Sequence, residues 1–433
     1  MPKVAFITLG CKVNQYETNA MSQEFIEKGY EVVEHHKKAD IYVINTCTVT
    51  NMSDRKSRQM LRRVKELNPD SIVIACGCYV QVAKDEVAKI EDIDLILGNN
   101  EKKNIVEHLE QYQKDKKRQL EIEDLMQQRE FVEFGDVTYT EKTRAVVKIQ
   151  DGCDRFCSYC IIPYARGRVR SRKPEGIISE ITKIAQEGIK EVVITGIHVA
   201  SYGKDFKENY GLINLLEDLN KIEGIERIRL SSIEPLILDE QFINRLSKLE
   251  KICHNFHLSL QSGCDETLKR MNRRYNTEQF KTVVNLIRNT YKDAILTADV
   301  IVGFPGETEE EFEKTYKFLE DVKFYKTHVF KYSPRKGTKA AVMENQIDGN
   351  IKEQRSKKLI ELSNNFEKEY NESYKGKTVE VLWEEEKEGI YKGHTQNYLL
   401  AYYKPEKGDM NLENKITKAN CLSAESDHII VEI

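Results

Sequence analysis

Short apolar runs alternate with longer amphipathic stretches through the first hundred residues. Four runs predict strands that are buried on both faces: Val4–Leu9, Ile41–Asn45, Ile72–Ala75 and Leu95–Leu97. The stretches between and after them predict helices near 15–29, 54–67, 80–90 and 101–112. Buried strands that alternate with helices are typical of a parallel, doubly wound sheet. Residues 1–112 are therefore expected to form an N-terminal α/β domain.

The pattern changes twice after that domain. Residues 113–142 are highly charged and show little periodicity, which predicts a linker. Strand and helix signals then alternate again, and a charged helix is expected around 350–372. Six further strands are predicted: Ala145–Ile149, Val192–Thr195, Arg227–Leu230, Phe256–Leu260, Ala298–Val302 and Thr327–Phe330. Six βα units favour an incomplete parallel barrel, (β/α)6, over residues 143–372.

The last sixty residues change to short strand signals separated by glycines. The expected strands are Thr378–Leu382, Tyr398–Tyr403, Lys415–Ala419 and Ile429–Glu432. This spacing predicts a small β-barrel of the oligonucleotide-binding type over residues 373–433. The whole chain is thus expected to be an α/β protein with a small β-barrel domain at its end.

Composition adds little to this organisation. A chain of 433 residues with 40% hydrophobic and 32% charged residues is typical of a globular protein with several domains. No apolar run approaches the roughly 20 residues that span a bilayer, and the N-terminus lacks a secretory signal, so we expect a cytoplasmic protein with no membrane partner. The net charge of −4 neither favours nor excludes a nucleic-acid partner.

Three of the ten cysteines form a short motif. Cys153, Cys157 and Cys160 have the spacing C-x3-C-x2-C in IQDGCDRFCSYCIIPYARGR. In a reducing compartment such cysteines are buried thiols, reactive thiols or metal ligands. A structural zinc site needs four ligands, and no fourth cysteine or histidine stands nearby. Three thiolates suit a [4Fe–4S] cluster with one iron left open.

A second set of cysteines is dispersed. Cys11, Cys47 and Cys78 each lie one to three residues after a predicted strand, where the carboxyl ends of parallel strands converge. The residues leave two interpretations open: three buried core cysteines, or three ligands of a second cluster. Cys76 precedes Cys78 by two residues and could replace it, because alternate strand residues share a face. Cys253, Cys264 and Cys421 stand alone and are expected to be core residues.

Both the compact and the dispersed cysteines lie in motifs that resemble those of a known family. With Tyr159 as its aromatic residue, the C-x3-C-x-aromatic-C motif resembles the signature of radical S-adenosylmethionine enzymes. G-C-x-x-N near the start, N-T-C, G-C and then the triplet resemble the methylthiotransferases over essentially the whole chain. The segment from Gly376 resembles a TRAM domain, a β module that delivers RNA to modification enzymes.

This resemblance implies a cofactor set and a reaction. One cluster would bind the methionine part of S-adenosylmethionine and cleave its C5′–S bond to give a 5′-deoxyadenosyl radical. A second [4Fe–4S] cluster on Cys11, Cys47 and Cys78 would carry the sulfur that is methylated and inserted. Cys78 is preferred over Cys76 because its family counterpart follows a glycine. The expected partners are tRNA, a low-potential electron donor of flavodoxin or ferredoxin type, and a sulfur donor.

Strand ends supply candidate cofactor-binding residues. In ADVIVGFPGETEEEF, Thr308 and Glu311 predict a capping box, and Gly303 would allow backbone to approach the adenosine closely. Polar groups at other strand ends could bind the amino group or ribose of the cofactor, although such groups often only cap helices. These candidates are Thr195, Gly196, Ser232, Glu234 and Gln261, together with Tyr159 in the cluster motif.

Two segments supply candidate RNA contacts. RGRVRSR places arginines at alternate positions, which in an extended chain would form a basic stripe for phosphates. Surface salt bridges are the alternative for these side chains. They are Arg166, Arg168, Arg170 and Arg172. In the TRAM-like segment, Tyr391 and Tyr398 are candidates for stacking on bases.

The N-terminal motif TLGCKVNQYET suggests the substrate. Through Lys12, Val13 and Gln15 it is most similar to the branch that acts on threonylcarbamoyladenosine. The expected reaction is methylthiolation at C2 of N6-threonylcarbamoyladenosine at position 37 of the tRNA anticodon loop. Other branches act on isopentenyladenosine in tRNA or on an aspartate of a ribosomal protein. A radical methylase with one cluster, and an iron–sulfur sensor or RNA-binding protein without catalysis, remain alternatives.

Overall fold

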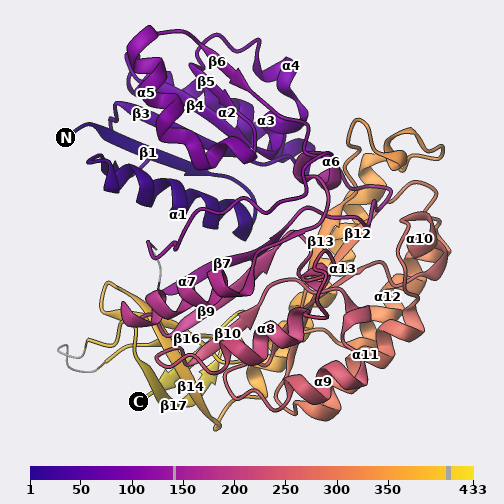
Figure 1. Ribbon diagram of the computed structural model, residues 1–433. Helices are drawn as coiled ribbons and strands as arrows, with labels where there is room; N and C mark the ends of the chain where they lie inside the picture. Colours follow the sequence, from indigo (N-terminus) through magenta and orange to yellow (C-terminus); the bar gives the residue numbers. More distant parts are fainter. Residues whose placement is uncertain (140–142, 406–410) are drawn as a thin grey trace.

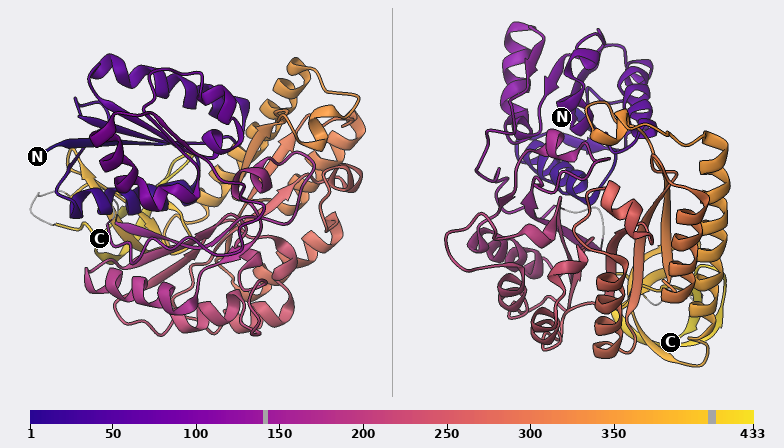
Figure 2. Two further views of the ribbon diagram at one scale, coloured as in Figure 1. Left: turned by 45° about the horizontal axis from the view of Figure 1, so that its top comes forward. Right: turned by 90° about the vertical axis from the view of Figure 1, so that its right-hand side faces the viewer.

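The computed structural model describes residues 1–139, 143–405 and 411–433. Figure 1 shows an N-terminal α/β domain above a larger α/β domain, with a small β-barrel at the lower left. In Figure 2 the N-terminal and C-terminal domains both border the open side of the central domain. Three separate cores are therefore arranged around one region between the domains.

The N-terminal domain is a six-stranded parallel sheet with strand order β2-β1-β3-β4-β5-β6. Helices α1 and α5 pack on one face, and α2, α3 and α4 pack on the other. The elements are β1 (Lys3–Thr8), α1 (Lys12–Glu27), β2 (Glu31–Val33), β3 (Ile41–Thr46), α2 (Asn51–Leu67), β4 (Ile72–Gly77), α3 (Cys78–Val82), α4 (Lys84–Val87), β5 (Leu95–Leu97), η1 (Asn100–Asn104), α5 (Ile105–Asp115) and β6 (Gln119–Glu121).

The doubly wound sheet and its four central strands confirm the prediction. Strands β2 and β6 lie at the two edges of the sheet and were not predicted. Strand β6 falls inside the segment that we expected to be a linker. Both edge strands have three residues and none of them is fully buried, so they carry no apolar run that a sequence pattern could reveal.

The central domain is an incomplete parallel barrel. Its two sheets, β10-β9-β7-β8 and β11-β12-β13, are connected by isolated parallel bridges between Ile228 and Ile252 and between Ile233 and Leu258. The six predicted strands are all present: β7 (Arg144–Asp151), β9 (Glu191–Gly196), β10 (Arg227–Leu230), β11 (Asn255–Gln261), β12 (Ile295–Val302) and β13 (Lys326–Lys331). The short β8 (Arg170–Ser171) pairs antiparallel with β7.

Helices cover the outside of this barrel (Figure 1). The capping box of Thr308 and Glu311 at the start of α12 is present as predicted. The helical elements are α6 (Ile162–Arg166), α7 (Pro174–Gln186), η2 (Val199–Ser201), α8 (Leu212–Leu219), η3 (Pro235–Ile237), α9 (Glu240–Leu246), α10 (Asp265–Arg270), α11 (Thr277–Thr290), α12 (Glu309–Val322), η4 (Lys339–Val342) and α13 (Gly349–Glu372).

The C-terminal domain is a closed five-stranded barrel with order β14-β15-β16-β18-β17. Trp383 and Cys421 lie in its core. Strand β15 was not predicted, because the glycines and polar residues of GIYKGHT hide its alternation. The strands are β14 (Thr378–Lys387), β15 (Ile390–Thr395), β16 (Leu400–Tyr403), β17 (Ile416–Ala424) and β18 (Ile429–Glu432).

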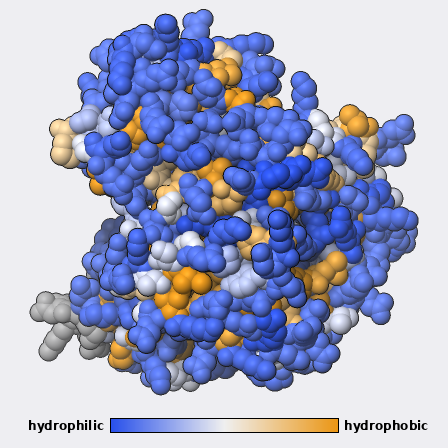
Figure 3. Space-filling model, in the orientation of Figure 1, coloured by the Kyte–Doolittle hydropathy of each residue, from blue (hydrophilic) through white to orange (hydrophobic). Residues whose placement is uncertain are grey.

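Arginines of β10 hold the C-terminal barrel against the central domain. Arg227 donates hydrogen bonds of 3.0 Å to the backbone carbonyls of His394 and Glu380, and Arg229 donates one of 3.0 Å to the carbonyl of Gln396. The face seen in Figure 3 is mostly hydrophilic, with small, separate apolar patches. Within the described residues, no helix has the length and apolar character needed to cross a bilayer.

Candidate functional site

The three dispersed cysteines lie at one end of the N-terminal sheet. Cys11 is the N-cap of α1, Cys47 directly follows β3, and Cys78 is the first residue of α3. The glycine before Cys11 has φ +99°, and a Cβ on it would lie 2.7 Å from Cys47 Sγ. A side chain at Gly10 would therefore separate these two segments, which explains the glycine.

The thiols of this set influence one another. Burial is the main reason for the raised pKa of Cys11 and for the pKa of about 11 of Cys47, and a negative charge on Cys78 raises both further. No three such side chains in the described chain converge on a single metal ion. In an iron–sulfur cluster, by contrast, each thiolate binds a different iron, so the ligands need not meet at one point. The donor set thus fits a cluster better than a lone ion.

Cys76 differs from this set in its surroundings. It is fully buried in the apolar cluster that includes Ile74 and Leu97. Strand alternation does not place Cys76 and Cys78 on one face, because the strand ends at Gly77, whose φ is +99°. Of the two cysteines, Cys78 is therefore the better placed for a cluster.

Next to Cys78 lies a buried ionic network, and the sequence pattern did not predict this network. Arg166 Nε lies 3.1 Å from Cys78 Sγ, and the same guanidinium group pairs with both carboxylate oxygens of Glu17. Glu17 also accepts hydrogen bonds from Lys102 at 2.5 Å and from Lys148 at 2.7 Å. Burial alone would raise the pKa of Glu17, but these three cations hold it well below its usual range.

The network carries excess positive charge beside Cys78. Lys148 and Arg166 also pair with Asp151, at 2.6 and 3.3 Å, and Arg170 lies 3.8 Å from it. Two carboxylates thus face four buried cations. A thiolate or an anionic cluster at Cys78 would offset this excess, so the charges of the site fit an iron–sulfur group with thiolate ligands.

The arginine stripe expected from RGRVRSR does not form. Arg166, Arg170 and Arg172 are at most 1% exposed and make ion pairs inside the protein. The chain is not extended there, because Arg166 ends α6 and β8 has only two residues. Of the four, only Arg168 is partly exposed, and it pairs with Asp154 at 3.2 Å. Buried guanidinium groups cannot reach RNA phosphates, so the prediction was wrong for three of the four.

The compact cysteine motif forms a loop after β7. The amide of Cys153 donates to the carbonyl of Gly167 at 3.0 Å, and Arg273 Nη1 lies 3.3 Å from Cys157 Sγ. Burial raises the pKa of Cys153 to about 11 and that of Cys160 to about 12. A raised pKa means that these thiols hold their protons at neutral pH, so iron would have to displace the thiol protons of Cys153 and Cys160 on binding. Three thiols with an arginine donor on one sulfur suit a [4Fe–4S] cluster.

The predicted cofactor-binding residues divide into two groups. Thr195, Gly196 and Ser232 line a large cavity that is described below. Glu234 is buried; burial would raise its pKa, but His198 and Arg155 lower it to about 2.

Tyr159, Gln261 and Gly303 do not line that cavity. Tyr159 packs against Met271 and Phe304. Gln261 ends β11 with φ +69°. A Cβ on Gly303 would meet the side chain of Lys352 at 2.3 Å, so the near neighbour of this glycine within the chain is a lysine.

A cavity of about 910 Å³, here called the central cavity, lies between the three domains. The N-terminal domain contributes Cys11 and Lys12, the central barrel contributes residues in and after its strands, and the C-terminal barrel contributes His394 and Tyr398. The walls of the cavity exclude bulk water around Lys12, and this desolvation, together with the nearby charges of Arg144 and Arg229, lowers the pKa of its side chain. Three cations and three carboxylates line the cavity, and Lys12 lies next to one cysteine set. On the barrel side, the cavity is lined by the carboxyl ends of β9 and β10 and by residues along β11, β12 and β13, including the first residues of β11 and β13.

The two tyrosines that we expected to contact RNA differ in position. Tyr398 lines the central cavity, where its ring stacks on His394 with centroids 4.5 Å apart and Arg229 lies 4.6 Å from its centroid. Tyr391 is buried in the core of the C-terminal barrel against Trp383. The prediction that Tyr391 stacks on bases is wrong for this structure, because its ring packs inside the barrel.

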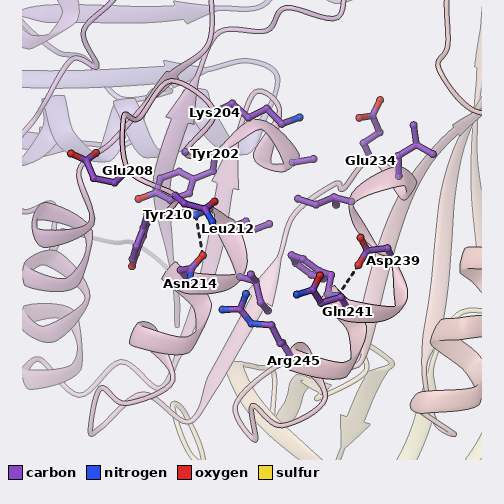
Figure 4. A pocket seen from close by; sticks show the side chains of 18 of the residues that line it. Tyr202, Lys204, Glu208, Tyr210, Leu212, Asn214, Glu234, Asp239, Gln241 and Arg245 are labelled. Carbon is purple, nitrogen blue, oxygen red and sulfur yellow. Dashed lines mark hydrogen bonds between the residues drawn. The ribbon is translucent and has the colours of Figure 1, made fainter.

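Two smaller pockets lie outside the barrel strands. One, of about 640 Å³, has side chains of both charges around it, including Lys204, Glu234 and Arg245 (Figure 4). The other, of about 420 Å³, is here called the basic pocket. It lies beside the cluster loop, and its charged lining residues are Arg129, Arg155, Arg168, Lys204 and Arg274 with Asp154 and Asp205.

Comparison with known families gives two matches. Residues 147–319 match the Radical SAM superfamily, and residues 3–98 match the family described as "Uncharacterized protein family UPF0004". The first match contains the compact cysteine motif, and the second contains the dispersed set.

Curated relatives match over nearly the full length. The threonylcarbamoyladenosine tRNA methylthiotransferase MtaB of Bacillus subtilis is 43% identical over 98% of this chain and 94% of its own. The MtaB of Aquifex aeolicus is also 43% identical, over 92% of this chain and 95% of its own. The tRNA-2-methylthio-N(6)-dimethylallyladenosine synthase of Clostridium botulinum is 35% identical over 98% of this chain and 96% of its own.

A solved structure supports the architecture. The radical S-adenosylmethionine methyltransferase TsrM from Kitasatospora setae matches with a TM-score of 0.55 and 15% identity, covering 76% of this chain and 73% of that one. At this identity the likeness concerns the fold alone.

Proposed function

This chain belongs to the radical S-adenosylmethionine tRNA methylthiotransferase family, and we propose that it methylthiolates C2 of N6-threonylcarbamoyladenosine at position 37 of tRNA. The observation that carries the proposal is 43% identity, over nearly the whole chain, to a threonylcarbamoyladenosine enzyme. The dimethylallyladenosine relative reaches 35% over a similar length, so the acidic substrate is favoured.

Membership of this family implies S-adenosylmethionine and a [4Fe–4S] cluster. We assign this cluster to Cys153, Cys157 and Cys160, and a second one to Cys11, Cys47 and Cys78. When bound, these groups supply the radical chemistry and the sulfur. Arg273 would stabilise the thiolate of Cys157, and Arg166 would stabilise that of Cys78, because each donates to that sulfur.

The central cavity is the proposed place of the target adenosine. Cys11 lines it on one side, while Thr195, Gly196 and Ser232 line it at the ends of barrel strands. Strand ends are where ligands bind in open α/β folds, which supports cofactor contacts by these three residues. Glu234 and Gln261, which follow β10 and end β11, belong to the same end of the barrel and remain proposed contacts. Tyr398 would contact the base from the third domain.

The basic pocket is the proposed contact for tRNA phosphates. Five cations and two carboxylates line it, and Asp154 and Arg155 belong to the loop between Cys153 and Cys157. Phosphate contacts fix the position of a nucleic acid without reading its sequence. Of the four arginines in RGRVRSR, Arg168 alone is proposed for this role. A low-potential flavodoxin or ferredoxin and a sulfur donor are further proposed partners.

Mass spectrometry of tRNA nucleosides tests the proposed function. A strain that lacks this gene is expected to lose 2-methylthio-threonylcarbamoyladenosine, accumulate threonylcarbamoyladenosine and keep its methylthiolated isopentenyladenosine. Expression of the wild-type chain should restore the lost nucleoside. An unchanged 2-methylthio-threonylcarbamoyl signal in the deletion strain would reject the proposal.

A further inference from the structure

The central cavity contains a charge that the described chain leaves without a partner. The other acidic residues, lysines and arginines on its walls are paired: Arg229 with Glu191 at 2.7 Å, Lys326 with Glu367 at 2.7 Å, Asp299 with His257 at 3.1 Å and Asp427 with His428 at 2.9 Å. The Lys12 side chain is exposed to the cavity. Within the described residues its ammonium group makes neither a hydrogen bond nor an ion pair.

The surroundings of Lys12 favour an anion. It is the first residue of α1, a helix of 16 residues, and the N-cap Cys11 makes no side-chain hydrogen bond to the first turn. The positive end of the helix dipole therefore adds to the charge of the lysine. Cys11 itself is a proposed cluster ligand, so an anion at Lys12 would lie near the place where sulfur is inserted.

We propose that Lys12 binds a carboxylate on the N6 substituent of the target adenosine and thereby selects an acidic substrate. This inference rests on the proposed function. A threonylcarbamoyl group ends in a carboxylate, whereas a dimethylallyl group is apolar and would leave the ammonium group without a partner. A site built around a polar contact discriminates strongly against an analogue that lacks the contact, because the protein group then stays unpaired.

The test compares two anticodon stem-loops that differ at one group. One carries threonylcarbamoyladenosine, and the other carries the same nucleoside with its carboxylate replaced by a carboxamide. The measured quantity is the acid-to-amide ratio of kcat/KM for the 2-methylthio product. Lys12→Met should lower this ratio roughly 10- to 100-fold, the range of a charge-assisted contact. Lys12→Arg should retain most of it.

Lys28→Met is the matched control, because it removes the same charge from the other end of α1, outside the cavity lining. It should leave the ratio at its wild-type value. If Lys12→Met lowers activity equally on both stem-loops, or keeps the wild-type ratio, Lys12 does not bind the carboxylate and the inference is overturned.

Binding separates this inference from the proposed function. The acid-to-amide ratio of dissociation constants, measured by fluorescence anisotropy with the reconstituted enzyme, should fall in Lys12→Met as the kinetic ratio does. If the wild-type enzyme makes no product from the acid stem-loop, the proposed function fails, yet the binding ratio still decides whether Lys12 holds the carboxylate. If Lys12→Met loses iron, Lys12→Gln provides the same comparison.

Discussion

Replacing Glu17 should destabilise the protein more than its position on a helix suggests. Its carboxylate forms ion pairs with three cations, Lys102, Lys148 and Arg166, and its side chain is 1% exposed. Glu17→Gln keeps the size of the side chain but leaves these cations without their main anion. Breaking a buried ion pair in this way costs about 3–5 kcal/mol. For the N-terminal domain, which ends with β6 at Glu121, that corresponds to a fall in Tm of roughly 10–20 °C.

Differential scanning calorimetry of the metal-free protein measures this effect. Several domains need not unfold in one step, so the transition that involves the N-terminal domain is the one to follow. Glu27→Gln on the same helix is the control, since Glu27 is exposed and its loss should change stability by at most about 0.5 kcal/mol.

The pH dependence of the effect follows from the lowered pKa of Glu17. A carboxylate whose pKa is lower in the folded state stabilises the fold above its unfolded pKa of about 4.3 and loses that contribution as the pH falls through the folded value. The difference between wild type and Glu17→Gln should therefore be constant from pH 6 to 8. If Glu17→Gln has the same Tm as Glu27→Gln, the ionic network does not stabilise the fold and the reasoning is refuted.

Two further predictions concern the cysteines and the basic pocket. Cys157→Ala should abolish formation of 5′-deoxyadenosine from S-adenosylmethionine, whereas Cys47→Ala should retain it and lose sulfur insertion; continued insertion in Cys47→Ala would make the dispersed set structural. Arg168→Gln should weaken tRNA binding and reduce the slope of log K against log salt by about one, as expected for one lost phosphate contact. Lys221→Gln, which lies outside the pocket, should leave that slope unchanged, and an unaltered slope in Arg168→Gln would exclude the contact.

The fold was largely predictable because its central strands are continuous apolar runs. In β3, for example, the four middle residues, Tyr42–Asn45, are fully buried. A strand that is buried on both faces is typical of the centre of a parallel sheet. The short strands β2 and β6 were missed because edge positions need no apolar residues, and β15 was missed because its glycines and polar residues hide the alternation.

The charged part of the site was harder to predict. Glu17 lies in NQYETNAM, which reads as an ordinary polar helix, and its burial depends on Lys148 and Arg166 from another domain. The alternating arginines of RGRVRSR suggested a surface stripe, but Arg166, Arg170 and Arg172 are buried by ion pairs with acidic residues outside this segment, such as Glu17, Asp151 and Glu180. One local signal was present: Asn14 and Glu17 lie one helical turn apart just after Cys11, and both contact Arg166.

Iron analysis of the anaerobically reconstituted protein tests the central assignment most directly, namely that six cysteines form two cluster sites. Wild-type protein should hold about eight irons per chain, the content of two [4Fe–4S] clusters. Joint replacement of Cys11, Cys47 and Cys78 by alanine should leave about four, while Cys76→Ala should keep about eight. A full complement of iron after loss of the three dispersed cysteines would contradict the account.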